Sequence, residues 1–179
     1  MRKTFLAIIL MAVLTVFAGC SSEGQSGDLS WSFDPDTGVL DLTGSGKMED
    51  YKKVEVDKFK TTTTAPWADY YSDIKTVNLP EGLTRIGDYT FYKCYSLKEI
   101  NFPKGLTSIG ENAFFCCSSL TEITLPEGLT SIGDSAFAYC SKRGTTFPEG
   151  LTAVTLPDSL TSIGDFAFSD CAKLKEINL

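Results

Sequence analysis

Hydrophobic positions recur at a fixed interval along the C-terminal part of this chain. Between Leu120 and Cys140, apolar residues alternate with polar ones, and a proline and a glycine follow the alternation. A shift of 23 residues places each position of this unit on its counterpart in the neighbouring unit. A period of this length predicts a solenoid, because one repeat alone has no second layer against which to bury its apolar face. The matching sets are Pro80, Pro103 and Pro126; Ile86, Ile109 and Ile132; Phe91, Phe114 and Phe137; Cys94, Cys117 and Cys140; and a later unit repeats them as Pro157, Ile163, Phe168 and Cys171.

Each unit is predicted to contain a short strand, a second extended segment and a short helical turn. In the unit that begins at Leu120, Ile123 and Leu125 point inward from the strand, and Pro126 ends it because proline donates no ladder hydrogen bond. Gly133 is expected to adopt a backbone conformation closed to other residues. Asp134 is expected to cap the helical turn, and Asp88, Glu111 and Asp165 occupy the same place in the other units.

Stacked units are expected to repeat about 4.8 Å apart, so that equivalent side chains touch. The prediction is therefore a row of phenylalanine rings and a row of cysteine side chains inside the solenoid. Five cysteines lie beyond residue 20, namely Cys94, Cys116, Cys117, Cys140 and Cys171. Their regular spacing favours small buried thiols, although disulfides between neighbouring units remain an alternative.

The repeat Leu-x-x-Ile-x-Leu-Pro-x-Gly-Leu-x-x-Ile-Gly-x-x-Ala-Phe-x-x-Cys, over residues 74–179, resembles the BspA-type leucine-rich repeat of bacterial surface proteins. The resemblance implies a leucine-rich-repeat solenoid, with an N-terminal cap of a β-hairpin and a short helix over residues 29–73. It also implies a non-catalytic protein that adheres to or binds host macromolecules. The departures from the pattern are Thr90 for alanine, Ser159 for glycine and an insertion over residues 141–150.

The cap is predicted from period-2 alternation and from turn residues. Residues 29–46 predict a hairpin, in which Asp34, Pro35 and Gly38 make the turn, and this interpretation is favoured over a calcium loop. Residues 52–64 are interpreted as a loop or a weak edge strand, and a short helix is expected from residue 65 to residue 71. The aromatic residues of this region either plug the open end of the solenoid or form a sugar-binding platform.

The first residues resemble an export signal. Arg2 and Lys3 precede an apolar run of secretory length, and Phe17-Ala18-Gly19-Cys20 resembles a bacterial lipobox. Residues 1–19 are therefore interpreted as a lipoprotein signal peptide that is removed, with Cys20 as the lipidated residue. An ordinary secretory leader is the alternative. Residues 20–28, rich in serine and glycine, are predicted to be a lipid-anchored flexible tether.

Composition argues against several functions. The chain contains no histidine, which removes the usual general base and the commonest metal ligand. Beyond the leader, 14 basic and 23 acidic side chains leave a net charge of −9, which disfavours nucleic acids and anionic lipid surfaces. We expect no enzyme activity, no cofactor and no metal site, and contact with a membrane only through the lipid on Cys20.

The leader predicts an exported, membrane-anchored lipoprotein of the outer membrane or cell surface, and two of its surfaces are candidates for binding an unknown protein or glycan. One is the insertion, which is expected to expose Lys142 and Arg143. The other is the solvent-facing side of the predicted strands, which carries Thr76, Asn78, Glu99, Asn101, Glu122, Thr124, Thr155, Glu176 and Asn178.

The alternative to a binding module is an assembly component that self-associates through the coil that ends at Leu179.

Overall fold

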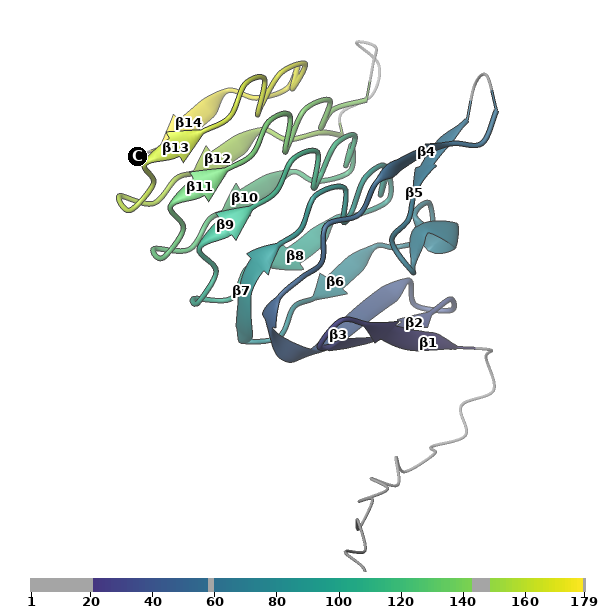
Figure 1. Ribbon diagram of the computed structural model, residues 1–179. Helices are drawn as coiled ribbons and strands as arrows, with labels where there is room; N and C mark the ends of the chain where they lie inside the picture. The colour runs from purple at the N-terminus through teal and green to yellow at the C-terminus, as the bar shows by residue number, and fades with distance from the viewer. Residues whose placement is uncertain (1–20, 58–59, 143–148, 179) are drawn as a thin grey trace, which may run out of the picture.

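A computed structural model describes residues 21–57, 60–142 and 149–178 of the 179-residue chain. The predicted signal peptide (1–19) and Cys20 lie outside the described residues. Figure 1 shows coils stacked along one axis, with an antiparallel sheet at one end and the C-terminal coil at the other. The predicted solenoid is therefore confirmed for the described part of the chain.

The N-terminal sheet consists of β1 (Ser22–Ser26), β2 (Leu29–Asp34) and β3 (Val39–Lys47). β2 and β3 form the expected hairpin, with Asp34 opposite Val39. The prediction of a flexible tether over residues 20–28 is wrong, because β1 pairs antiparallel with β2 from Ser22 to Ser26. Ladder hydrogen bonds use main-chain groups, so even a serine- and glycine-rich segment is ordered when an unpaired strand edge lies beside it.

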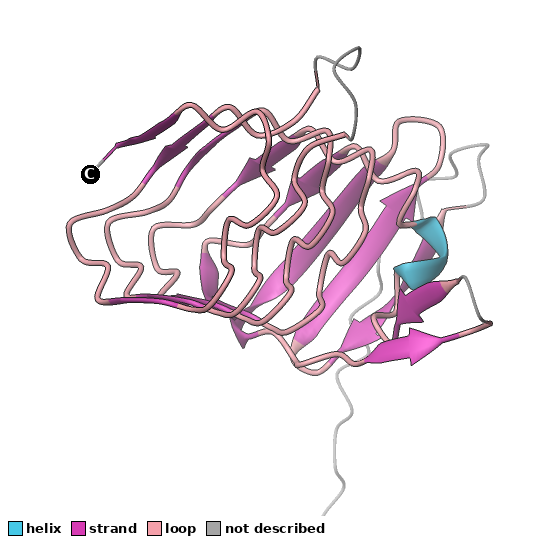
Figure 2. Cartoon of the chain, turned by 90° about the horizontal axis from the view of Figure 1, so that it is seen from above, coloured by secondary structure: helices cyan, strands magenta, loops and turns pink. Residues whose placement is uncertain are grey.

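Each coil contributes one strand to each of two parallel ladders, which face one another across the core (Figure 2). β3 pairs in parallel with the first strand of both ladders, which joins the hairpin to the first coil. The first ladder contains β6 (Thr76–Asn78), β8 (Glu99–Asn101), β10 (Glu122–Thr124), β12 (Ala153–Thr155) and β14 (Glu176–Asn178). The second ladder contains β7 (Gly82–Ile86), β9 (Ser108–Ile109), β11 (Ser131–Ile132) and β13 (Ser162–Ile163).

The first ladder is interrupted between β8 and β10. β8 pairs with β6, and β10 pairs with β12, but β8 and β10 do not pair with each other. The second ladder is continuous across the same coils, since β9 pairs with both β7 and β11. The second ladder and the turn segments therefore hold these two coils together, and the strand surface is divided into two parts.

The turn segments of the coils are not helical. Within the described residues the only helix is the 3-10 turn η1 (Ala68–Tyr70), shorter than the helix expected over residues 65–71. Tyr89 and Lys93 have φ values of 53° and 64°, and the later coils repeat such left-handed residues at the same two places. A residue with positive φ interrupts a right-handed helix. The amides of this segment instead donate between coils, as from Phe91 to the carbonyl oxygen of Ala113 (2.8 Å).

The repeated glycine and aspartate have different roles from those predicted. Gly133 is not among the residues with positive φ. A Cβ atom at Gly133 would instead lie 2.7 Å from the Glu111 nitrogen of the preceding coil, so the glycine permits close stacking. The Asp134 carboxylate caps no helix of its own, and it accepts the Asp165 amide of the next coil at 2.8 Å.

A row of aromatic rings fills the core, as predicted. The ring centroids of Phe91 and Phe114 are 5.2 Å apart, and those of Phe137 and Phe168 are 5.4 Å apart. Trp67 begins the row, 6.0 Å from Phe91, and its indole nitrogen donates to the carbonyl oxygen of Thr90. Trp67, Trp31 and Phe33 are buried, as a plug of the core requires, whereas Tyr70 and Tyr71 of the same region are only partly buried.

A two-stranded antiparallel ribbon lies beside the first turn segment. It consists of β4 (Lys53–Glu55) and β5 (Thr61–Thr63), which is the edge-strand alternative for residues 52–64. The Lys93 ammonium group donates to the Thr61 hydroxyl at 2.6 Å and so attaches this ribbon to the first coil.

Cys94, Cys117, Cys140 and Cys171 line the core as buried thiols without disulfides, as expected, whereas Cys116 is only partly buried. The Cys117 and Cys140 thiols each donate to a phenylalanine carbonyl oxygen of the preceding coil, at 3.2 Å. Burial raises the pKa of both thiols well above the ordinary value. The repeated cysteine therefore connects coils through hydrogen bonds.

Candidate functional site

The predicted strand surface faces solvent on the first ladder. Thr76 lies opposite Glu99 and Asn78 opposite Asn101 in one part. In the other part Thr124 is aligned with Thr155, and Thr155 with Asn178, while Glu122 and Glu176 flank Ala153. The structure therefore brings the nine predicted residues into two patches, separated between β8 and β10.

Most side chains of this surface have no role in holding the fold. Glu99, Asn101, Glu122 and Thr124 are exposed, and within the described residues no hydrogen bond or ion pair holds their side chains. The exception is Asn78, whose amide donates to Asp41 of β3 at 2.6 Å. The sequence analysis missed Asp41, whose place opposite Asn78 depends on the pairing of β3 with β6.

The insertion is only partly described. Ser141 and Gly150 form an isolated bridge at its base, and Arg143 lies outside the described residues. Lys142 is partly buried, and its ammonium nitrogen lies 3.7 Å from Glu149. Lys142 is thus less exposed than expected.

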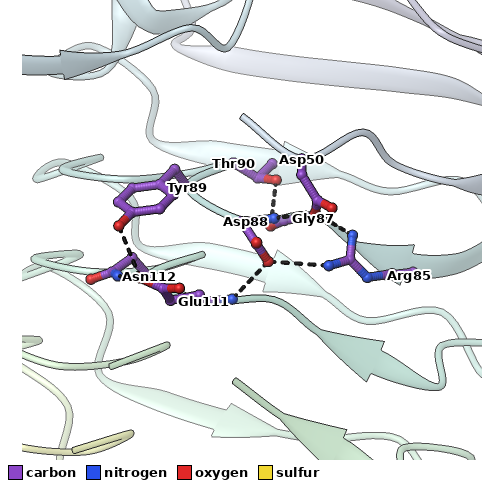
Figure 3. Close-up of polar contacts among 8 residues, drawn as sticks. All are labelled: Asp50, Arg85, Gly87, Asp88, Tyr89, Thr90, Glu111 and Asn112. Carbon is purple, nitrogen blue, oxygen red and sulfur yellow. Dashed lines mark hydrogen bonds and ion pairs between the residues drawn. The ribbon is translucent and has the colours of Figure 1, made fainter. Parts of the chain in front are cut away.

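A second polar surface follows the turn segments, directly after the second ladder (Figure 3). Asp88 follows β7 and accepts the Glu111 amide of the next coil at 2.9 Å, and Asp50 accepts the Asp88 amide at 2.9 Å. Arg85 bridges the carboxylates of Asp50 and Asp88. Burial by itself would raise the pKa of Asp50, but the Asp88 amide and the Arg85 guanidinium outweigh it and lower that pKa. These two aspartates are therefore structural.

Glu111 departs from this arrangement. One of its carboxylate oxygens accepts the Tyr89 hydroxyl and the Asn112 side-chain amide, both at 2.9 Å. No described hydrogen bond links the Glu111 carboxylate to the Asp134 amide, the link that the aspartates make elsewhere. Burial, followed by the hydrogen bond to Glu111, raises the pKa of Tyr89 to about 12.

Tyr89 and Asn112 belong to a row of residues that we call the turn column, namely Tyr89, Asn112, Ser135 and Phe166. All four have φ between 52° and 60°, and each occupies the same place in its coil. Phe166 is 73% exposed, and the other three are partly buried. The sequence carries one signal for this column, because this repeat position varies between neighbouring positions that hardly change.

Among the described residues, no group of three or more potential metal ligands lies together. None of their helices has the length and the apolar character that a bilayer crossing requires. The surfaces described above present carboxylates, amides, hydroxyls and aromatic rings to solvent.

Comparison with protein families identifies a match over residues 146–179, to the family described as the BspA type leucine rich repeat region (6 copies). The curated proteins contain no match.

Solved structures with a similar fold are bacterial leucine-rich repeat proteins. The T. pallidum leucine rich repeat protein is 30% identical with a TM-score of 0.56, and the match covers 88% of this chain and 72% of that one. A leucine-rich repeat protein from Eubacterium ventriosum is 25% identical with a TM-score of 0.64, and one from Bacteroides ovatus is 26% identical with a TM-score of 0.55. These two matches cover 89% and 85% of this chain but only 44% and 40% of the other chains, so this chain spans less than half of each.

Proposed function

The chain belongs to the leucine-rich repeat proteins of the BspA type, and from this premise we propose that it is a lipid-anchored cell-surface module. In this proposal it binds a protein or glycan partner and catalyses no reaction. Repeat scaffolds of this kind offer an extended surface with a rigid core behind it, which suits binding over an area.

The main observation in support of the proposal is that the inward side chains of each coil pack in the core, whereas most outward side chains of the strands have no role in holding the fold. The inward residues stack, while Glu99, Asn101, Glu122 and Thr124 point outward and have no described partner within the chain. Side chains that do not hold the fold are free to contact another molecule. They stand on strands, so their spacing is set before a partner arrives, which lowers the entropy cost of binding.

The anchor is proposed from the residues before β1. If Cys20 carries lipid, Ser21 alone separates it from the first residue of β1. The N-terminal sheet would then lie close to the lipid surface, without a flexible spacer.

The binding proposal is tested with purified protein against immobilised host matrix proteins and a glycan panel. A double charge reversal, Glu99→Lys with Glu122→Lys, is compared with the wild type and with a second double reversal, Glu81→Lys with Glu127→Lys. Glu81 and Glu127 are also exposed, but they lie on turns and not on the strands, so the second double variant controls for net charge. Binding that falls at least tenfold only in the Glu99 and Glu122 variant supports the strand surface. A panel with no bound component contradicts the binding function.

The anchor is tested separately, by metabolic labelling of cells with a palmitate analogue. The wild type should incorporate the label and Cys20→Ala should not, while both chains are exported. Digestion of intact cells with protease then distinguishes surface display from a periplasmic position. A labelled Cys20→Ala chain would show that the lipid is elsewhere.

Self-association is a second candidate function, favoured by exposed isoleucines on β13 and β14. Ile163 and Ile177 are 48% and 49% exposed, whereas the equivalent Ile132 and Val154 are 2% and 0% exposed. Exposed apolar side chains beside an unpaired strand edge favour association. Light scattering after size exclusion should show a dimer that Ile163→Asp converts to a monomer. A wild-type chain that stays monomeric at high concentration contradicts this candidate.

A further inference from the structure

We propose that the turn column binds a linear neutral glycan, which lies along the solenoid axis with about one sugar ring to each coil. The inference rests on the proposed binding function and names a ligand class and a site for it. The site consists of Tyr89, Asn112, Ser135 and Phe166, together with Glu111. It lies on the turn segments and not on the strand surface.

The chemistry at the start of the column suits a pyranose ring. A sugar offers an apolar C–H face to an aromatic ring and hydroxyl groups to planar acceptors and donors, and binding sites combine the two kinds of contact. The Tyr89 ring is held between the Tyr92 ring, with centroids 5.6 Å apart, and the hydrogen bond from its hydroxyl to Glu111. An ordered ring of this kind contacts a ligand at little cost in side-chain entropy.

Glu111 and Asn112 supply the hydrogen-bonding groups. One carboxylate oxygen of Glu111 accepts from both Tyr89 and Asn112, as Figure 3 shows. Within the described residues, no hydrogen bond reaches the other oxygen of Glu111 or the side-chain oxygen of Asn112. Two acceptors thus remain beside the Tyr89 ring, and both are oriented by the hydrogen bonds that their own groups already make. An adjacent pair of sugar hydroxyls can donate to them.

The backbone conformation of the column sets the direction of its side chains. Tyr89 and Phe166 have φ values of 53° and 60°, and a second place in each coil has positive φ as well, so this conformation belongs to the repeat. The shared φ also makes the four side chains leave their coils at equivalent points, about 4.8 Å apart, as parallel stacking requires. That step is close to the length of one pyranose ring in an extended glycan.

Charge selects a neutral glycan over an acidic one. The positions immediately before the column residues are Asp88, Glu111, Asp134 and Asp165, so a carboxylate accompanies each coil. The Arg85 guanidinium is paired with Asp88 and the Lys93 ammonium is bonded to Thr61, so each of these cations already has a partner. A sulfated or uronic acid polymer would still meet the carboxylates of Glu111, Asp134 and Asp165, which disfavours its binding.

The test uses the full chain in detergent and a panel of neutral tetrasaccharides, measured by isothermal titration and by saturation-transfer NMR. The panel contains cellotetraose, xylotetraose, maltotetraose, mannotetraose and chitotetraose, and a heparin tetrasaccharide is the anionic probe. Saturable binding of at least one neutral tetrasaccharide, and weaker binding of the heparin fragment, is the expected result. Absence of saturable binding across the neutral panel overturns the inference, and so does preference for the heparin fragment.

Substitutions then locate the site. Tyr89→Ala and Phe166→Ala should each weaken binding about tenfold, the effect of losing one aromatic contact. Phe166 is largely exposed, so its substitution leaves folding intact even if Tyr89→Ala does not. Glu111→Gln should weaken binding while preserving the side-chain shape, and Tyr95→Ala, an exposed tyrosine outside the column, is the matched control. Unchanged affinity in Phe166→Ala and Glu111→Gln overturns the inference.

The two proposals fail in different ways. If the immobilised partners bind and only the strand-surface variants weaken them, the binding function stands and the glycan column is wrong. If neither set of ligands binds, the binding function itself fails.

Discussion

The rings of Phe114 and Phe137 lie one above the other, with centroids 5.0 Å apart and planes within 4° of parallel. Neither side chain has any exposed surface. The coil spacing imposes this geometry, because residues 23 positions apart occupy the same place in successive coils. Each ring therefore packs against the rings of the coils before and after it, and the loss of one ring affects the packing of both.

Phe114→Ala is expected to destabilise the protein by about 3–5 kcal/mol, the usual cost of truncating a buried phenylalanine. Urea unfolding followed by circular dichroism measures the change in the free energy of unfolding. Phe166→Ala is the control, because an exposed side chain contributes within about 0.5 kcal/mol. Equal effects of the two substitutions would contradict the stacked core.

Gly133→Ala should destabilise the chain by about 1–3 kcal/mol, a typical cost for overpacking. The added methyl group would lie 2.7 Å from backbone atoms of the preceding coil, which have no room to move without separating the coils. Gly105→Ala is the matched control, since its nearest contacts are 3.6 and 3.7 Å away and its φ is not positive. Thermal unfolding compares the two, and a Gly133→Ala midpoint no lower than that of Gly105→Ala would contradict close stacking as the reason for the glycine.

Asp50→Asn should lower the free energy of unfolding at neutral pH. When the pH is lowered, the variant should lose less of this free energy than the wild type. The folded-state pKa of Asp50 is lowered from 3.8, so its contribution is present above that value and disappears as pH falls through the folded pKa. The difference in unfolding free energy between wild type and Asp50→Asn is therefore expected to be constant from pH 7 to pH 5 and to shrink below about pH 4. A difference that does not change with pH would show that the carboxylate charge has no such role.

Thiol labelling should distinguish two adjacent cysteines. Burial raises the pKa of the Cys117 thiol, and this side chain has no exposed surface, whereas Cys116 is partly exposed. Because the thiolate is the reactive form, we expect maleimide to modify Cys116 in the native protein well before Cys117. Both cysteines lie in one tryptic peptide, residues 105–142, so fragmentation of this peptide by tandem mass spectrometry after timed quenching reports the order, with urea-unfolded protein as the control in which both react. Modification of Cys117 at the same rate as Cys116 in native protein would contradict the buried thiol row.

The repeat could be predicted from the sequence because its signals are periodic and each has a local cause. Proline at the strand edge, inward isoleucine and leucine, and the buried phenylalanine and cysteine all appear where the 23-residue register places them. The hairpin was predictable for the same reason, since alternation and a proline-glycine turn are local signals. The outward strand residues followed directly from the inward ones.

The failures concern contacts between coils, which no single repeat contains. Composition predicted a flexible segment at Ser22–Ser26, but an edge of β2 was available to pair with it. The sequence predicted that Asp134 caps its own turn, but its carboxylate accepts a hydrogen bond from the Asp165 amide of the next coil. Likewise, nothing local to Glu111 indicates that it would hold Tyr89 and Asn112.

The sequence by itself thus determined the solenoid, its period, its core residues and the direction in which the strand residues point. Tertiary structure alone decided that the first ladder breaks between β8 and β10, that two residues of each turn have positive φ and interrupt a helix, and that Glu111 holds Tyr89 and Asn112. The reason is physical. Periodicity records which side chains a coil must bury, whereas hydrogen bonds between coils depend on how closely the backbones stack, and that distance is set only when every coil is in place.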